Sequence, residues 1–142
     1  MNQIRKVIVV LFAVVLVGTI FVPSDVSAKT LYYGASHWKG KDTSKNGMVS
    51  KITLKEKKIV LKGSLVKASK QSKLYSGKAK YYKSKKRTFK LAKNVKFYGV
   101  GGTAGKQKLT RSDVKVYCKN ANGLYVVLKV KNGKVVAVSF CS

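Results

Sequence analysis

After residue 47, apolar and polar residues alternate along much of the chain, a pattern typical of β-strands with one buried face. Ile52 and Leu54 alternate with polar residues, and the same alternation resumes at Ile59 and Leu61 after a charged turn. Two such runs on either side of a polar turn predict a β-hairpin. Tyr81 and Tyr82, a basic turn at 83–86, and then Phe89 and Leu91 predict a second hairpin.

The C-terminal segment predicts a third hairpin around the dipeptide Asn132-Gly133, which favours a two-residue type I′ turn. Apolar residues on the incoming strand recur at every second position, at Leu124, Val126, Leu128 and Val130. Counting back from the turn predicts three cross-strand pairs: Val130 with Val135, Leu128 with Ala137, and Leu124 with Cys141.

Residues 110–121 fit either a strand or a helix. In the helical interpretation Thr110 caps the first turn with Asp113 three residues on, and apolar residues follow at helical spacing, at Val114, Tyr117, Cys118 and Ala121. In a three-stranded meander, Cys118 and Cys141 would lie on opposite faces, beyond the ~7 Å Cα separation that a disulfide spans. We favour the helix, because it removes that conflict and allows a Cys118–Cys141 disulfide. Two cysteines in an exported chain most often form such a bridge.

The predicted order is strands, then a helix near 110–121, then two strands. A mainly β (α+β) fold of this order is that of a small OB-like, partly open β-barrel, here with about five to six strands. The alternative is a split antiparallel sheet with one covering helix. The likeness to OB-type barrels concerns the order of elements only and assigns no function by itself.

The first 28 residues predict a signal peptide. Arg5 and Lys6 precede an apolar run at 7–22, and Val26-Ser27-Ala28 provides a cleavage boundary. An uncleaved anchor is the alternative, but the run is shorter than the ~20 residues of a spanning helix. Residues 29–47, rich in Gly, Ser and Lys, predict a loosely ordered N-terminal arm, and residues 48–142 a single β-rich domain of a secreted protein.

Charge narrows the functional classes. The 142 residues include 28 lysines and three arginines against four acidic residues, which gives a net charge of +27. Such an excess predicts an anionic partner. The scarcity of arginine indicates that this partner is attracted by its overall negative charge and that its individual groups are not recognised by bidentate hydrogen bonds.

The densest basic segment, residues 73–90, interleaves cations with aromatic side chains, as in grooves that hold single-stranded nucleic acids. The alternative is a solvated hairpin whose lysines protect an edge strand. A glycine-rich loop at 99–105 lies before two further lysines. The predicted polyanion-binding residues are Lys78, Lys80, Tyr81, Tyr82, Lys83, Lys85, Lys86, Arg87, Lys90, Lys106 and Lys108.

The residues needed for catalysis or metal binding are few. His37 is the one imidazole, and Asp42, Glu56 and Asp113 are the carboxylates after residue 28. The loop at 99–105 resembles a dinucleotide-binding fingerprint but lacks the helix that should follow it. We therefore expect no enzyme, no metal site and no cofactor.

These observations lead to one main hypothesis and two alternatives. The main hypothesis is a secreted, monomeric β-domain that binds extracellular polyanions, such as wall teichoic acid, an anionic membrane surface or nucleic acid, through lysine charge. The first alternative is a secreted cationic antimicrobial or toxin-like protein. The second is an accessory domain without a ligand.

Overall fold

The structure, a computed structural model, describes residues 29–142, so the predicted signal peptide lies outside the described residues. Within this range the chain forms seven strands, one α-helix and one 3₁₀ helix. In chain order they are β1 (Thr30–His37), β2 (Met48–Leu54), β3 (Lys58–Ala68), η1 (Gln71–Tyr75), β4 (Lys80–Gly101), β5 (Gly105–Leu109), α3 (Arg111–Lys119), β6 (Tyr125–Lys131) and β7 (Lys134–Cys141).

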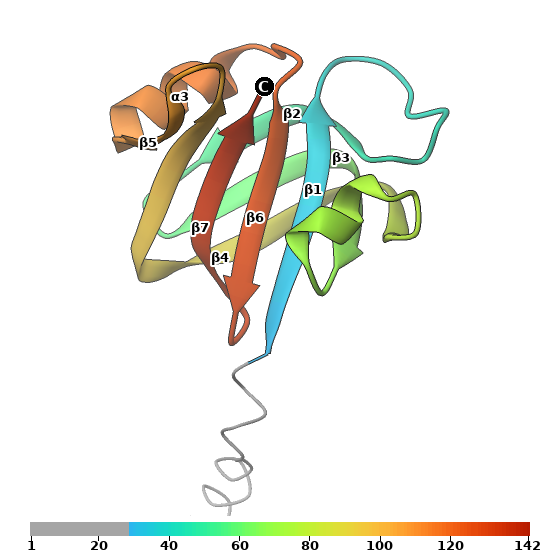
Figure 1. Cartoon of the computed structure of the whole chain (residues 1–142), viewed down its shortest axis with the longest axis horizontal. Coiled ribbons are helices and arrows are strands. Elements are labelled where there is room, and N and C mark those ends of the chain that lie inside the picture. The colour runs from blue at the N-terminus through green and yellow to red at the C-terminus, as the bar shows by residue number, and fades with distance from the viewer. Residues whose placement is uncertain (1–28) are drawn as a thin grey trace, which may run out of the picture.

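Hydrogen bonds join five of these strands in a ring. β1 pairs with β3 and with β6, β6 pairs with β7, β7 pairs in parallel with β4, and β4 pairs back with β3. Figure 1 shows β1, β6 and β7 side by side in front, with β2, β3 and β4 crossing behind them. The ring is not a regular barrel, since β1 and β3 pair through only three residue pairs. The prediction of a mainly β, partly open fold with one helix is confirmed, with seven strands in place of the predicted five to six.

The first strand was missed by the sequence analysis. Thr30–His37 form β1, so the prediction of a loosely ordered arm is wrong for these residues. Leu31, Tyr33 and Ala35 face the main core, while Tyr32 packs on the outer side of the sheet. Both faces of β1 are therefore covered, which hides the polar–apolar alternation expected of a half-exposed strand.

The predicted second hairpin is also wrong. Residues 80–101 form one continuous strand, β4, with no turn at 83–86. This basic stretch stays extended because it pairs with β3, where Lys86 lies opposite Lys62 and Lys85 opposite Gly63. Residues 83–86 also contain no Gly, Asn or Pro to favour a tight turn.

The first and third hairpins are confirmed, with a change of register in the third. Asn132 and Gly133 both have positive φ (55° and 78°), as a type I′ turn requires, and Val130 lies opposite Val135. A bulge between Lys129 and Val130 then shifts the pairing by one residue. The other two predicted pairs are therefore wrong: Leu128 lies opposite Val138, and Tyr125 lies opposite Cys141.

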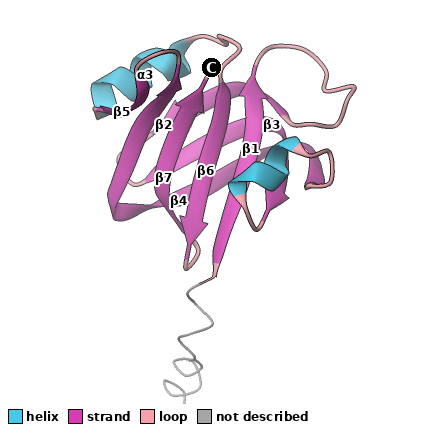
Figure 2. Cartoon of the chain, viewed as in Figure 1, coloured by secondary structure: helices cyan, strands magenta, loops and turns pink. Residues whose placement is uncertain are grey.

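The helix predicted over 110–121 is confirmed as α3, at one end of the strands (Figure 2). Thr110 Oγ1 accepts a hydrogen bond from Asp113 N (3.1 Å), and Thr110 N donates to Asp113 Oδ2 (2.8 Å). These bonds lower the pKa of Asp113. Val114 is fully buried and the Tyr117 ring stacks on Phe140 at 5.3 Å, so the helix closes that end of the main core.

The disulfide prediction is wrong, because both cysteines are free. Cys118 packs against the main core, whereas Cys141 packs against a second apolar cluster centred on Val66, Leu74 and Val127. The bulge in the C-terminal hairpin explains this separation. It places Phe140 in the main core, and alternation along the strand then directs Cys141 to the opposite face.

Gly63 in β3, where the pairing with both β2 and β4 shifts in register, generates a stability prediction. Gly63 has a φ of +145°, and a Cβ at this position would collide with the backbone of Met48 and Val49. We expect Gly63→Ala to lower the free energy of unfolding by about 3 kcal/mol through strain and steric overlap. The measurement is urea-induced unfolding.

The matched control is Gly77→Ala, because Gly77 also has a positive φ (+81°) but nothing within 4 Å of the added Cβ. This control should lose about 1 kcal/mol, the cost of the left-handed backbone alone. Equal losses in the two variants would show that the close approach of β2 to Gly63 carries no cost.

The free thiols give a second prediction. Burial raises the pKa of the Cys118 thiol to about 11 and also raises the pKa of Cys141. Because only the thiolate is nucleophilic, alkylation of the native protein at about pH 8 should be much slower than alkylation in urea at the same pH. Mass spectrometry of iodoacetamide-treated samples measures both rates. Equal rates in the two conditions would contradict the burial of these thiols.

Candidate functional site

On the outer surface of β2, β3 and β4, basic side chains lie in regular rows. Ile52, Leu54, Ile59 and Leu61 are buried in the main core, so the residues between them point outward. Strand pairing arranges the outward residues in three rows that cross the strands. The rows, together called the lysine face, are Lys51–Lys62–Lys86, Thr53–Val60–Thr88 and Lys55–Lys58–Lys90.

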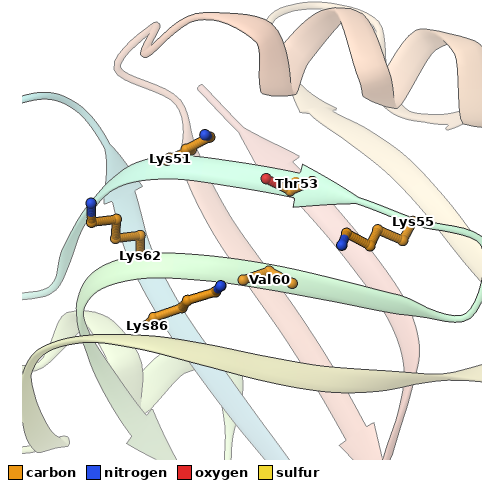
Figure 3. Close-up of a pocket in the computed structure, with 6 residues that line it drawn as sticks. All are labelled: Lys51, Thr53, Lys55, Val60, Lys62 and Lys86. Atoms are coloured by element: carbon orange, nitrogen blue, oxygen red, sulfur yellow. The ribbon is translucent and has the colours of Figure 1, made fainter.

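The lysine face is hollowed by a groove of about 380 Å³, the first groove. Its lining residues are Lys51, Thr53, Lys55, Val60, Lys62 and Lys86. In Figure 3 the ammonium groups of Lys55 and Lys86 lie on either side of Val60. The groove thus has a small uncharged floor with cations around it.

A second groove of about 900 Å³ adjoins the first and shares Lys55 with it. It lies where the β2–β3 turn, the middle of β4, the start of α3 and the start of β7 meet. Eight of its lining residues are basic and one is acidic: Lys55, Lys57, Lys58, Lys90, Lys93, Arg111, Lys115 and Lys134, with Glu56. The two grooves therefore meet at Lys55, and both are lined mainly by basic residues.

Arg111 holds the edge of the second groove in place. Its guanidinium donates hydrogen bonds to the carbonyl oxygens of Lys55 (3.1 Å) and Glu56 (2.9 Å). It also lies over the Phe97 ring, with 5.6 Å between the guanidinium carbon and the ring centroid. The first residue of α3 therefore fixes the β2–β3 turn while it contributes a positive charge to the groove.

The acidic side chains are mostly occupied elsewhere. Asp42 accepts hydrogen bonds from Ser64 Oγ (2.9 Å) and from the backbone N–H groups of Asn46 and Gly47. Burial raises the pKa of Asp42, but these hydrogen bonds outweigh it and the net pKa is lowered. Asp113 caps α3. The cations of the lysine face are thus left to repel one another across strands.

The predicted binding residues divide over several surfaces. Lys86 and Lys90 lie on the lysine face, whereas Lys85 and Arg87 alternate with them and point the other way. Arg87 is used internally: its guanidinium donates to the carbonyl oxygens of Gly63 (3.1 Å) and Lys83 (2.8 Å). Lys78 lies in the loop before β4.

The predicted aromatic platform is not on the lysine face. Tyr81 packs against the second apolar cluster and Tyr82 against the main core. Cations surround the Tyr82 ring, with Lys80 Nζ 5.3 Å and Lys67 Nζ 5.8 Å from its centroid. Burial raises the pKa of Tyr82, but hydrogen bonds and charge from these two lysines outweigh it and the net pKa is lowered.

Lys106 and Lys108 lie far from the other predicted residues along the sheet. They belong to β5, where Lys106 pairs with Val100 and Lys108 with Tyr98. Lys106 Nζ lies 4.1 Å from the centroid of the Tyr98 ring. Along β4 the separation from Lys86 to Tyr98 is about 40 Å of extended chain. The structure therefore does not join the glycine-rich loop to the lysine face.

Four lysines of the lysine face were missed by the sequence analysis: Lys51, Lys55, Lys58 and Lys62. The signal was present in the segment 51–62, where lysines occupy outward positions of the hairpin and Ile or Leu the inward ones. The prediction followed the highest density of basic residues along the chain. A binding face depends instead on which residues of neighbouring strands point to the same side.

His37 does not contribute to this site. Its side chain is 1% exposed, and its Nδ1 has no hydrogen-bond partner among the described residues. Burial lowers the pKa of His37, which favours the neutral imidazole. Among residues 29–142, no three His, Cys, Asp or Glu side chains are grouped as metal ligands. In the same range, no helix has the length and apolar character that crossing a membrane takes.

Comparisons of the chain with protein-family models, with curated proteins and with solved structures found no match.

The repulsion within the lysine face gives a third prediction. Lys62 lies directly between Lys51 and Lys86, and like charges in directly opposite positions destabilise a sheet. We expect Lys62→Gln to raise the free energy of unfolding by about 0.5 kcal/mol at low salt. The gain should shrink at high salt, where screening weakens the repulsion.

Urea-induced unfolding at two salt concentrations measures this effect. Lys41→Gln, in the exposed loop after β1, is the control and should change stability little at either concentration. A loss of stability in Lys62→Gln at low salt would contradict the assignment of mutual repulsion to this row.

Proposed function

We propose that this protein binds polyanions through the lysine face of β2, β3 and β4. Residues 1–28 predict export, so the proposed partners are anionic polymers or surfaces outside the cell. The single observation that carries the proposal is the arrangement of six lysines in two cross-strand rows around an uncharged floor. Repulsion within these rows is a cost that a bound anion would relieve.

The scaffold supports this proposal, because it holds the positions of the lysines on a buried core. Ile52, Ile59 and Leu61, which alternate with the floor and the lysines, are each at most 3% exposed. The backbone positions from which the lysines project are therefore set before a ligand arrives. The flexible ammonium groups can then adjust to anions of different shape.

Lysine also determines the kind of selectivity to expect. Each ammonium is a compact charge with no fixed fork of donors, so it attracts phosphate, sulfate and carboxylate groups alike. The two arginines of the described range have their guanidinium groups bound to backbone carbonyl oxygens. We therefore expect affinity to follow charge density and to fall steeply with salt.

The experiment is a salt titration of binding to a fluorescently labelled oligothymidylate, used as a generic polyanion. The triple variant Lys51→Gln, Lys62→Gln and Lys86→Gln removes the first row of the lysine face. The slope of log affinity against log salt should decrease by about 2 in this variant, because each phosphate contact of a single strand contributes about 0.7.

The matched control removes the same charge from the exposed loop after β1, through Lys39→Gln, Lys41→Gln and Lys45→Gln. This control should keep most of the wild-type affinity and slope. If the two triple variants lose affinity equally, the protein binds as a uniformly basic particle and the lysine face is not a site. If the wild-type protein binds no polyanion at low salt, the proposed function is wrong.

A further inference from the structure

We infer that the partner is a linear chain of phosphate or sulfate groups without bases, which lies along β3 and occupies both grooves at once. This inference rests on the proposed polyanion binding and specifies its ligand. It depends on two features of the lysine face: the chemistry of the lining residues and the continuity of the two grooves.

The lining residues offer charge and hydroxyl groups but no aromatic ring on which a base could stack. The first groove is lined by Lys, Thr and Val, and the second by Lys, Arg, Leu, Ala and one Glu. Phe97, beneath Arg111, is 5% exposed and its ring face is covered by the guanidinium. Modules that hold single-stranded nucleic acids stack successive bases on aromatic side chains. A nucleic acid would therefore contact these grooves through its phosphates alone.

The aromatic residues nearest in sequence to the site serve the core instead. Phe89, between Thr88 and Lys90 on β4, points inward, and its ring meets Tyr33 edge to face at 5.0 Å. Tyr82 packs against the same core. Both rings are partly buried on the side of the sheet opposite to the lysine face, so bases of a chain that lies on that face would not stack on them.

The two grooves form a track along the strands. Lys51 and Lys55 are separated by about 13 Å of β2, with the hydroxyl of Thr53 between them. Beyond Lys55, the second groove adds Arg111, Lys115 and Lys134 in the same hollow. A chain that follows the strands would meet a row of lysines, an uncharged row, and then a second and larger group of cations.

This length exceeds what a single anionic group can occupy. A chain that spans both grooves gains from the second contact at high effective concentration, whereas a short anion binds one groove at a time. Lys55 lines both grooves and is therefore the residue on which their joint occupation depends most.

The first test compares two probes with the same number of phosphates, an oligothymidylate and a base-free deoxyribose-phosphate oligomer. We expect equal affinities, because stacking of even one base would favour the oligothymidylate by about 5-fold or more. A clear preference for the oligothymidylate would overturn the base-free ligand while leaving polyanion binding intact. If neither probe binds at low salt, the proposed function itself fails.

The second test varies chain length with inorganic polyphosphates, from pyrophosphate to long chains. The affinity per phosphate should rise with length and level off once both grooves are filled. Lys55→Gln should weaken binding of the long chains more than binding of pyrophosphate, and Lys41→Gln should affect neither. Equal affinity per phosphate at all lengths, or equal effects of Lys55→Gln on short and long chains, would overturn the continuous track.

Discussion

The hydrogen bonding of β3 to three other strands is the constraint on which the rest of the structure depends. The first half of β3 pairs with β2 on one side, its last residues pair with β1, and β4 pairs along its length on the other side. The register shifts beside Gly63, where β2 and β4 each carry one extra residue, let one strand serve these partners in turn. The residue at this point must be glycine, because the backbone of β2 approaches it too closely for any side chain. The same strand closes the ring and forms the middle of the lysine face.

The position of β3 in the ring explains how a sheet tolerates rows of like charge. Cross-strand lysine pairs destabilise the sheet locally, by at most about 1 kcal/mol each. The inward residues of the same strands, such as Ile59 and Leu61, are buried in the main core and supply a larger favourable term of about 2 kcal/mol each. The fold can therefore carry an electrostatic cost on its outer surface, and an anionic ligand would convert that cost into affinity.

Arginine and lysine side chains have different roles in this structure, as Arg111 and Arg87 show. Both guanidinium groups donate to backbone carbonyl oxygens and lie over an aromatic ring, so they join neighbouring segments of the fold. The lysines of the lysine face instead point into solvent. A planar fork suits fixed backbone geometry, whereas a flexible ammonium suits a partner of variable shape.

Features whose physical causes lie within a few residues could be predicted from the sequence. Thr110 and Asp113 cap α3 through contacts three residues apart, and Asn132-Gly133 sets the C-terminal turn by its backbone preference. The total charge also follows from composition alone. Other features depend on partners distant in the chain and arise only in the folded protein: the place of β1, the unbroken course of β4, and the bulge that separates Cys118 from Cys141. The lysine face belongs to this second group, because its rows exist only once pairing brings three strands into register.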